Sequence, residues 1–239
     1  MKNLENKVAF VTGGSKGIGY GVAAALSSMG VRVGITSRHR EEAEKAASEI
    51  TKNGKGEVIG IEADVRNFES QQAAIKQLTD KWGQLDLVVA NAGVGHFGSI
   101  EDLTPDQWQQ TIDTNLTGVF YSLKASIPAL KKSKGYIFTI PSLAGTNFFA
   151  GGTAYNASKF GVTGFTQAAM LDLRNYDIKV TTIMPGSVAT HFNDHKPGDE
   201  DAWKIQKEDI GELIVDLLKM NQRALPSKIE IRPTKPPQK

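Results

Sequence analysis

The chain has 239 residues, of which 40% are hydrophobic and 23% are charged, and its formal net charge is +2. This length and composition indicate one domain, residues 1–239, with a sizeable buried core. The small net charge gives no field that would attract nucleic acid or an anionic membrane. The absence of cysteine excludes disulfides, thiol nucleophiles and thiolate metal sites, and it suits a reducing cytoplasm, where we expect the protein. No run of about 18 apolar residues predicts a membrane span.

In chain order, short apolar runs alternate with segments of helical periodicity. The runs that resemble buried strands cover residues 8–12, 31–37, 57–63, 85–90, 136–140, 179–184 and 228–232. The helical segments cover residues 18–29, 41–52, 69–82, about 105–131, 155–174 and 208–220. This alternation predicts an α/β fold, a doubly wound parallel sheet of about seven strands with helices on both faces. In such sheets ligands bind beyond the carboxyl ends of the strands.

The first strand is followed by a glycine-rich turn, TGGSKGIG, at residues 12–19. Its Gly13, Gly17 and Gly19 permit a tight turn and close approach of the backbone to a pyrophosphate, at the positive end of the next helix. Glycine-rich turns also serve plain chain reversal, but the position between a strand and a helix favours a phosphate cradle. No Gly-Lys-Ser/Thr follows, so this is not a P-loop.

The end of the second strand bears on which dinucleotide would bind. It reads Thr36-Ser37-Arg38, without the acid that NAD sites place there, and Lys16 lies inside the glycine turn. Two cations suit a 2′-phosphate, so NADP(H) is favoured over NAD(H). The alternative is that Arg38 and Arg40 pair with the acids of the following helix, Glu41, Glu42 and Glu44.

Two further features, an acid and a Tyr-Lys pair, allow both a functional and a structural interpretation. Asp64, after the third strand, could accept a hydrogen bond from an adenine amino group, or it could cap a helix. Tyr155 and Lys159 in YNASK are four residues apart, so they share one helix face. An isolated Tyr-x-x-x-Lys is usually a surface pair, and only the other motifs favour a functional one.

Taken together, the motifs resemble the short-chain dehydrogenase/reductase family from about residue 4 to about residue 192. The matching set is TGGSKGIG at 12–19, Asn91-Ala92-Gly93, Asn115, Ser142, Tyr155-x-x-x-Lys159 and Pro185-Gly186. The resemblance implies a Rossmann-type domain and hydride transfer between NAD(P) and a carbonyl or alcohol.

The resemblance also implies a catalytic tetrad. Tyr155 would protonate the carbonyl oxygen, Ser142 would hold that oxygen, and Asn115 would hold a water in a proton relay. Lys159 would bind the nicotinamide ribose and favour the tyrosinate. Bringing a tyrosine pKa from about 10 to neutrality costs roughly 4 kcal/mol, and a cation about 4 Å away supplies a similar amount at an effective dielectric near 20. Ser142 lacks the G-x-S-x-G elbow of a hydrolase nucleophile.

The implied cofactor contacts extend along the whole edge of the sheet. They are Gly13, Ser15, Lys16, Gly17, Ile18, Gly19, Ser37, Arg38, Asp64, Val65, Asn91, Ala92, Gly93, Tyr155, Lys159, Pro185, Gly186, Val188 and Thr190. Thr190 would bind the nicotinamide carboxamide, or alternatively cap a turn.

Residues 187–207 form a short, polar segment that we expect to be the substrate loop, and residues 233–239 form a basic, proline-rich tail. Substrate-pocket candidates are Val94, His96, Phe148, Phe149 and Phe192. Phe148 and Phe149 are alternatively core or dimer-contact residues, and His96 is alternatively a polar loop residue. We interpret His191 and His195 as loop residues, because no carboxylate or third histidine at ligand spacing completes a metal site, and we predict no metal.

The favoured function is an NADPH-dependent carbonyl reductase acting on a small carbonyl or alcohol substrate. The alternative is a 3-oxoacyl-[acyl-carrier-protein] reductase. Its acidic carrier protein would contact Lys131, Lys132, Lys134 and Arg174. We prefer the interpretation that these cations are solvated residues at helix ends. A non-catalytic NADP-binding sensor is a third hypothesis, which the intact set around Tyr155 disfavours. We expect a homodimer or homotetramer, with the long helices at 105–131 and 155–174 as the contact.

Overall fold

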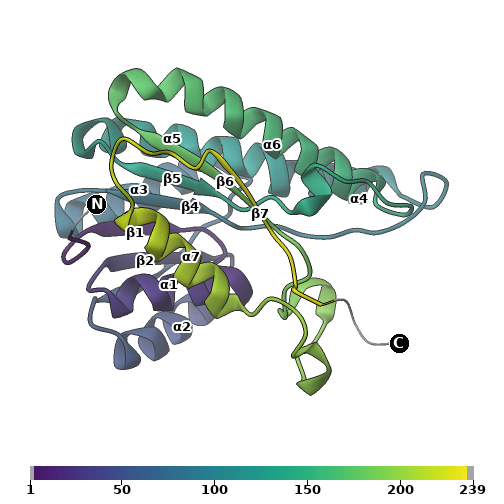
Figure 1. Ribbon diagram of the computed structural model, residues 1–239, viewed down its shortest axis with the longest axis horizontal. Helices are drawn as coiled ribbons and strands as arrows, with labels where there is room; N and C mark the ends of the chain where they lie inside the picture. Colours follow the sequence, from purple (N-terminus) through teal and green to yellow (C-terminus); the bar gives the residue numbers. More distant parts are fainter. Residues whose placement is uncertain (1–2, 236–239) are drawn as a thin grey trace.

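The computed structural model describes residues 3–235, so the end of the proline-rich tail, residues 236–239, lies outside the described residues. Residues 3–235 contain a seven-stranded sheet in the order β3-β2-β1-β4-β5-β6-β7, and all of its pairs are parallel (Figure 1). The strands are β1 (Val8–Val11), β2 (Arg32–Ser37), β3 (Val58–Glu62), β4 (Leu87–Ala90), β5 (Tyr136–Thr139), β6 (Lys179–Pro185) and β7 (Lys228–Ile231). The predicted fold class is confirmed.

Helices cover both faces of this sheet (Figure 1). One layer holds α1 (Gly17–Ser28), α2 (Arg40–Asn53) and α7 (Lys207–Lys219). The other layer holds α3 (Phe68–Trp82), α5 (Gly118–Ser133) and α6 (Thr153–Leu173), with α4 (Pro105–Ile112) before α5.

Strand β1 shows why both faces need a helical cover. Its four residues are fully buried, and successive side chains point to opposite faces. Val8 and Phe10 pack in the core beneath α3 and α5, whereas Ala9 and Val11 pack beneath α1 and α7. A strand without polar positions is therefore stable only between two layers.

The predicted helix at 105–131 is wrong in one respect, because it is interrupted. Helix α4 begins with Thr104 as its cap, and its hydroxyl oxygen accepts a hydrogen bond from the Gln107 backbone N–H. After α4 the chain forms one π-helical turn, Asp113–Thr117, before α5 continues. The Gly118 N–H reaches back to the Asp113 carbonyl, which accommodates one extra residue in the turn. Such bulges occur frequently at functional sites, and this one contains Asn115.

The chain order in the sheet reverses at β1, which pairs with β2 on one side and β4 on the other. The connections after these strands leave in opposite directions, so a crevice opens beyond their carboxyl ends. The fold therefore places the glycine turn after β1 beside the segment that follows β4.

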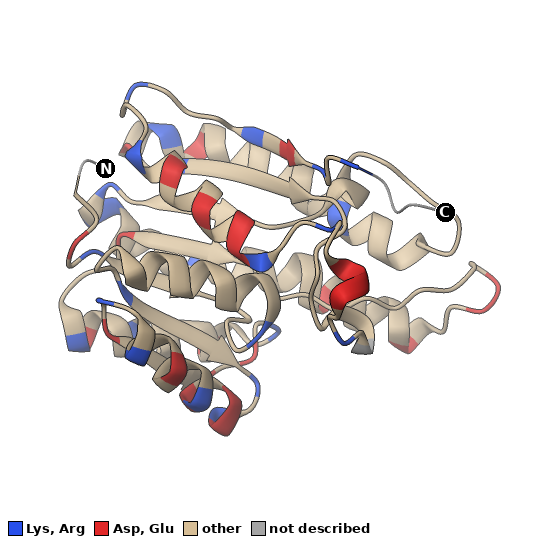
Figure 2. Ribbon diagram, turned by 60° about the horizontal axis from the view of Figure 1, so that its bottom comes forward, with Lys and Arg blue, Asp and Glu red and all other residues tan. Residues whose placement is uncertain are grey.

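Charged residues are distributed over the outer helices, and Figure 2 shows both signs interspersed. Helix α2, with the sequence REEAEKAASEITKN, carries four glutamates together with one arginine and two lysines. No helix within residues 3–235 combines the length and hydropathy needed to cross a bilayer.

Candidate active site

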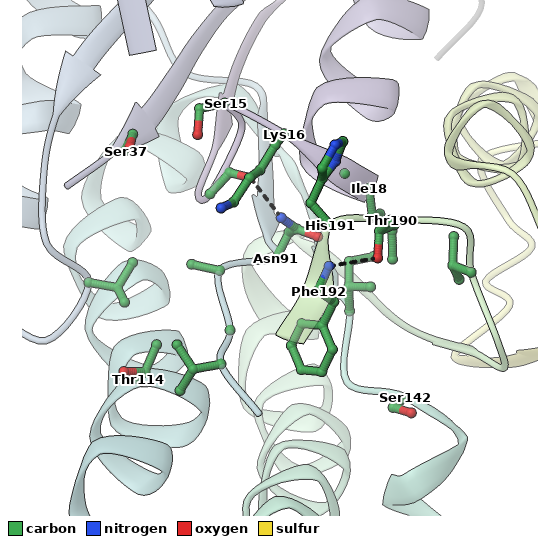
Figure 3. A pocket seen from close by; sticks show the side chains of 18 of the residues that line it. Ser15, Lys16, Ile18, Ser37, Asn91, Thr114, Ser142, Thr190, His191 and Phe192 are labelled. Atoms are coloured by element: carbon green, nitrogen blue, oxygen red, sulfur yellow. Dashed lines mark hydrogen bonds between the residues drawn. The ribbon is translucent and has the colours of Figure 1, made fainter. Parts of the chain in front are cut away.

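A cavity of about 580 Å³ opens at the carboxyl edge of the sheet, a size typical of ligand sites. Figure 3 shows Ser15, Lys16 and Ser37 toward one end and Ser142 toward the other. The lining comprises Gly13, Ser15, Lys16, Gly17, Ile18, Thr36, Ser37, Arg38, His39, Glu42, Ala63, Asp64, Val65, Arg66, Asn91, Ala92, Gly93, Val94, Thr114, Ile140, Pro141, Ser142, Tyr155, Lys159, Pro185, Gly186, Ser187, Val188, Thr190, His191, Phe192, His195 and Lys204. The predicted cofactor contacts all line it except Gly19, and the predicted catalytic residues do so except Asn115.

The glycine turn is tied to the end of β4. Gly13 has a φ of +64°, and a Cβ there would lie 2.9 Å from the Ala92 Cα, so only glycine fits without strain. The Asn91 amide donates to the Thr12 and Gly13 carbonyls at 3.0 and 3.1 Å. Gly19 lies outside the cavity because it packs on this turn, where a Cβ would approach the Gly13 carbonyl oxygen to 2.4 Å. The shape of the turn thus depends on β4 as well as on its own glycines.

Asp64 is not a helix cap, because Asn67 caps α3 by accepting from the Ser70 N–H. The Asp64 carboxylate instead accepts hydrogen bonds from the Arg66 guanidinium and backbone N–H. The hydrogen bond from Arg66 lowers the pKa of Asp64 below its usual value. Arg66 also lines the cavity. It was not predicted, although its position two residues after Asp64 indicates that it could belong to the same site.

The end of β2 carries charges of both signs. Arg40 pairs with Glu62 at 3.5 Å rather than with the acids of α2, so the predicted alternative is wrong for Arg40. Within residues 3–235 no carboxylate forms an ion pair with Arg38, although its charge contributes to the low pKa of Asp64. The strand itself ends without an acid, as predicted, but Glu42 of α2 lines the cavity and accepts a hydrogen bond from the Ser37 hydroxyl at 3.0 Å. The first turn of α2 brings it back to the strand end.

Tyr155 and Lys159 project from α6 into the other end of the cavity, beside Ser142. The Lys159 Nζ lies 5.3 Å from the centroid of the Tyr155 ring. Burial raises the pKa of Tyr155, and a hydrogen bond with Ser142 opposes that rise. In the protein alone, burial therefore outweighs any lowering of this pKa by Lys159, and the expected effect of Lys159 on the tyrosinate stays a prediction. At neutral pH the phenol is protonated and able to donate.

Lys159 is a buried lysine without an acidic partner. Its side chain is 5% exposed, and no carboxylate in the described part of the chain pairs with it. Burial lowers the pKa of Lys159 to about 8. A lysine buried without a counterion is costly and marks a functional site more often than a structural one.

Asn115 lies beneath the cavity at 1% exposure and connects three segments. Its amide oxygen accepts from the Val94 N–H at 2.8 Å, and its nitrogen donates to the Val94 carbonyl and to the Ser158 hydroxyl. Ser158 in turn donates to the Tyr155 carbonyl at 2.8 Å. Both amide N–H groups of Asn115 are therefore used within the protein, so a water would have to donate to an oxygen of this residue, and the expected water contact stays a prediction.

The predicted substrate-pocket residues fall into two groups. Val94 and Phe192 line the cavity, but His96, Phe148 and Phe149 do not. Phe148 is 86% exposed, so it is neither a pocket nor a core residue. Phe149 instead packs on Phe97, with ring centroids 6.0 Å apart. Phe97 was not predicted from the sequence, because nothing in the local pattern distinguishes it from other loop aromatics.

Thr190 supports both of its interpretations. Its side chain stands over Gly17 at the cavity wall, where a Cβ on that glycine would lie 3.4 Å away. Its hydroxyl oxygen also accepts from the Phe192 N–H at 3.4 Å, as a turn cap would (Figure 3).

The segment 187–207 contains a cluster of charged side chains that we did not predict. His195 and Lys204 line the cavity, and both contact the carboxylate of Asp201, which is 3% exposed. The Lys204 and His195 hydrogen bonds lower the pKa of Asp201 to about 2. His195, Glu200 and Asp201 have ligand atoms within 4.8 Å of one another, so the statement that no carboxylate accompanies the histidines is wrong. The Lys204 ammonium already neutralises Asp201, and we assign no metal there.

A family model described as short chain dehydrogenase matches residues 7–201, which include the whole cavity edge except Lys204. The chain belongs to the short-chain dehydrogenase family. This is a family of oxidoreductases.

Several known proteins resemble the chain. Trans-4-hydroxycyclohexanecarboxylate dehydrogenase of Sinomonas cyclohexanicum is 38% identical over 192 residues, covering 78% of this chain and 74% of the relative. A 3-oxoacyl-[acyl-carrier-protein] reductase of Synechocystis sp. is 36% identical over 197 residues, covering 82% and 79%. An alcohol dehydrogenase from the archaeon Thermococcus sibiricus, solved with 5-hydroxy-NADP, superposes with a TM-score of 0.90 at 29% identity, covering 98% and 99%.

In this short-chain dehydrogenase, replacing Lys159 by Met should raise stability. Below pH 8 the wild-type lysine is charged in the folded and unfolded states, so its burial costs roughly 3 kcal/mol. Between pH 8 and about 10.5 the folded state has lost the proton that the unfolded state keeps, and wild-type stability rises with pH. Lys159→Met should therefore increase the free energy of unfolding in urea at pH 7, by up to about 3 kcal/mol, and the difference should shrink above pH 8.

The matched control is Lys124→Met, at an exposed position of α5, which should leave stability unchanged. A less stable Lys159→Met protein at pH 7 would show that the ammonium is held by favourable contacts rather than merely buried.

Proposed function

We propose that the protein is an NADPH-dependent oxidoreductase that transfers a hydride between nicotinamide and a small carbonyl or alcohol substrate. The observation that carries this proposal is the convergence of Tyr155, Ser142 and Lys159 at one end of a cavity whose other end is the glycine turn. A phenol kept protonated, a neighbouring hydroxyl and a buried ammonium form a set suited to protonating an oxygen that gains electrons.

The remaining lining fits a dinucleotide. Backbone N–H groups of the glycine turn and the N-terminus of α1 would hold the pyrophosphate. Lys159 would hold the nicotinamide ribose, and Thr190 the carboxamide. The bound nicotinamide supplies or accepts the hydride.

The protein's own groups would then act on the substrate oxygen. The Ser142 hydroxyl orients the carbonyl and polarises it, and Tyr155 donates its proton as negative charge develops on that oxygen. The Lys159 ammonium favours the resulting tyrosinate, a contribution that becomes effective in the reacting state even though burial dominates the pKa of Tyr155 beforehand. Asn115 and Ser158 would position this end of α6 through their hydrogen bonds.

Tyr155→Phe tests the proposal. It should lower kcat for carbonyl reduction by about 100- to 10,000-fold, the usual contribution of a general acid, while NADPH affinity measured by cofactor fluorescence stays near that of wild type. Tyr176→Phe is the matched control, since Tyr176 is an exposed residue beside Lys131, outside the cavity. Full turnover in Tyr155→Phe would remove the assignment.

The preference for NADP(H) over NAD(H) is supported by an excess of positive charge at the end of the cavity where the adenosine ribose would lie. Arg66 pairs with Asp64, whereas Arg38 and Lys16 form no ion pair within residues 3–235, so these two cations outnumber the one carboxylate of Glu42, whose charge the Ser37 hydroxyl does not neutralise. A 2′-phosphate would supply the missing counter-charge. Two solved relatives, the Thermococcus sibiricus enzyme and a metagenomic short-chain oxidoreductase, were determined with 5-hydroxy-NADP and NADP respectively.

Arg38→Asp should therefore lower the ratio of kcat/KM for NADPH to that for NADH by about 10- to 100-fold, the range of one lost charge-assisted hydrogen bond. Arg40→Asp removes an equal charge from an exposed pair with Glu62, and it should leave the ratio unchanged. Equal ratios in wild type and Arg38→Asp would contradict the 2′-phosphate contact.

A 3-oxoacyl-thioester reductase is the second candidate, because the Synechocystis sp. relative has that name. The cations considered for an acidic carrier do not support it. Lys131 stacks on Tyr176 at 3.5 Å, and Lys134 pairs with Asp177 at 2.8 Å. They lie at the end of α5, just before β5 begins, and therefore at the edge of the sheet opposite the cavity. A carrier must approach the cavity edge, so these lysines would not meet it.

We further propose that the protein forms a homodimer or homotetramer through α5 and α6. Phe120 on α5 and Phe160 on α6 are 43% and 42% exposed on the outer side of their layer. Two large apolar side chains on adjacent helices favour a protein contact over water.

The double variant Phe120→Asp, Phe160→Asp should be monomeric in light scattering coupled to size exclusion, because the contact would bury unpaired carboxylates. Met29→Asp is the control, since Met29 is exposed on the opposite layer. An unchanged mass in the double variant would exclude these helices as the contact.

A further inference from the structure

Three segments that are distant in sequence place aromatic rings around Tyr155. Phe97 follows β4, Phe149 precedes α6, and Phe192 belongs to the segment after β6. The Tyr155 ring lies 5.2 Å from Phe97 and 5.8 Å from Phe192, measured between centroids. Phe97 in turn lies 6.0 Å from Phe149 and 6.4 Å from Phe192. All four contacts are tilted or edge-on, the arrangement that aromatic rings prefer.

The backbone at Gly95 makes room for two of these rings. A Cβ at that position would lie 2.7 Å from the Phe192 ring and 3.0 Å from the Phe97 ring. The two rings therefore contact the backbone at Gly95, although they belong to different segments. This close approach keeps Phe97 and Phe192 beside the Tyr155 phenol.

The rings are nevertheless not core residues. Phe97, Phe149 and Phe192 are 45%, 48% and 37% exposed, and Phe192 lines the same cavity as Ser142 and Tyr155. Exposed apolar area that adjoins a cavity is stabilised when a ligand covers it. The proposed position of the substrate oxygen, at the Tyr155 and Ser142 hydroxyls, puts the substituents of the carbonyl carbon on the side of the cavity that Phe192 lines, where Phe97 packs on the Tyr155 ring.

We propose that Phe97 and Phe192 are specificity-determining residues that select a carbonyl substrate bearing a flat, unsaturated ring beside its C=O group, with Phe149 supporting Phe97. This inference rests on the proposed reductase function for the position of the carbonyl. A planar π system can adopt the offset and edge-on contacts that Phe97, Phe192 and Tyr155 already make with one another, whereas a saturated ring of equal carbon number cannot.

The test compares acetophenone with cyclohexyl methyl ketone, which share a methyl ketone and a six-membered ring but differ in planarity. The quantity measured is the ratio of their kcat/KM values, and comparing variant with wild type cancels the intrinsic difference in reactivity. Phe97→Leu and Phe192→Leu keep an apolar side chain but remove the π face. Each should lower the ratio by about 3- to 10-fold, the usual range for one aromatic pair.

Phe148→Leu is the matched control, because Phe148 adjoins Phe149 in sequence but is 86% exposed and outside the cavity. Its ratio should equal that of wild type. If Tyr155-dependent reduction occurs and neither Phe97→Leu nor Phe192→Leu changes the ratio, the inference is overturned while the reductase function stands.

A binding measurement keeps the inference testable if neither ketone is turned over, the outcome that would count against the proposed function. Calorimetric titration of acetophenone into the NADP⁺-saturated protein should then show binding that weakens about 3- to 10-fold in Phe97→Leu and Phe192→Leu. Equal affinity in all the variants, or no binding of acetophenone to wild type, would overturn the inference.

Discussion

The parallel pairing of β1 with β4 is the interaction on which the whole site depends. It brings Thr12 and Asn91, 79 residues apart, into hydrogen-bond contact, and the Asn91 amide then fixes the carbonyls of the glycine turn. Because β2 pairs on the other side of β1, the crevice between the two halves of the sheet opens at this point. The cradle at one end of the cavity is thus a property of two strands rather than of one glycine-rich sequence.

The opposite end of the cavity depends on a departure from regular helix. The π-helical turn at Asp113–Thr117 places Asn115 where its amide satisfies both backbone groups of Val94 and reaches Ser158 on α6. A buried amide with each N–H paired is strongly orienting, since any displacement leaves a polar group without a partner. The loop after β4 and the helix bearing Tyr155 are therefore held at one distance from each other.

The fold and the site differ in how much the sequence predicts. The strands were predictable because both faces are buried, which leaves continuous apolar runs such as Val8–Val11. The residues at the strand ends were predictable because parallel strands deliver them to one edge. Glu42, Arg66, Phe97 and Lys204 were not, since their positions depend on loop conformations and on partners such as Asp64 and Asp201. The bulge at Asn115 was missed for the same reason, because its partner Val94 is 21 residues away.

The buried ammonium of Lys159 affects which amino-acid substitutions the protein can tolerate. A chain selected only for folding would replace this lysine, because an apolar side chain of the same length would suit its surroundings better. Its presence is a local conflict between folding stability and the requirements of a site, of the kind expected at functional sites. Substitutions that weaken the core would therefore be tolerated less well in this protein than in a variant that has lost the buried lysine.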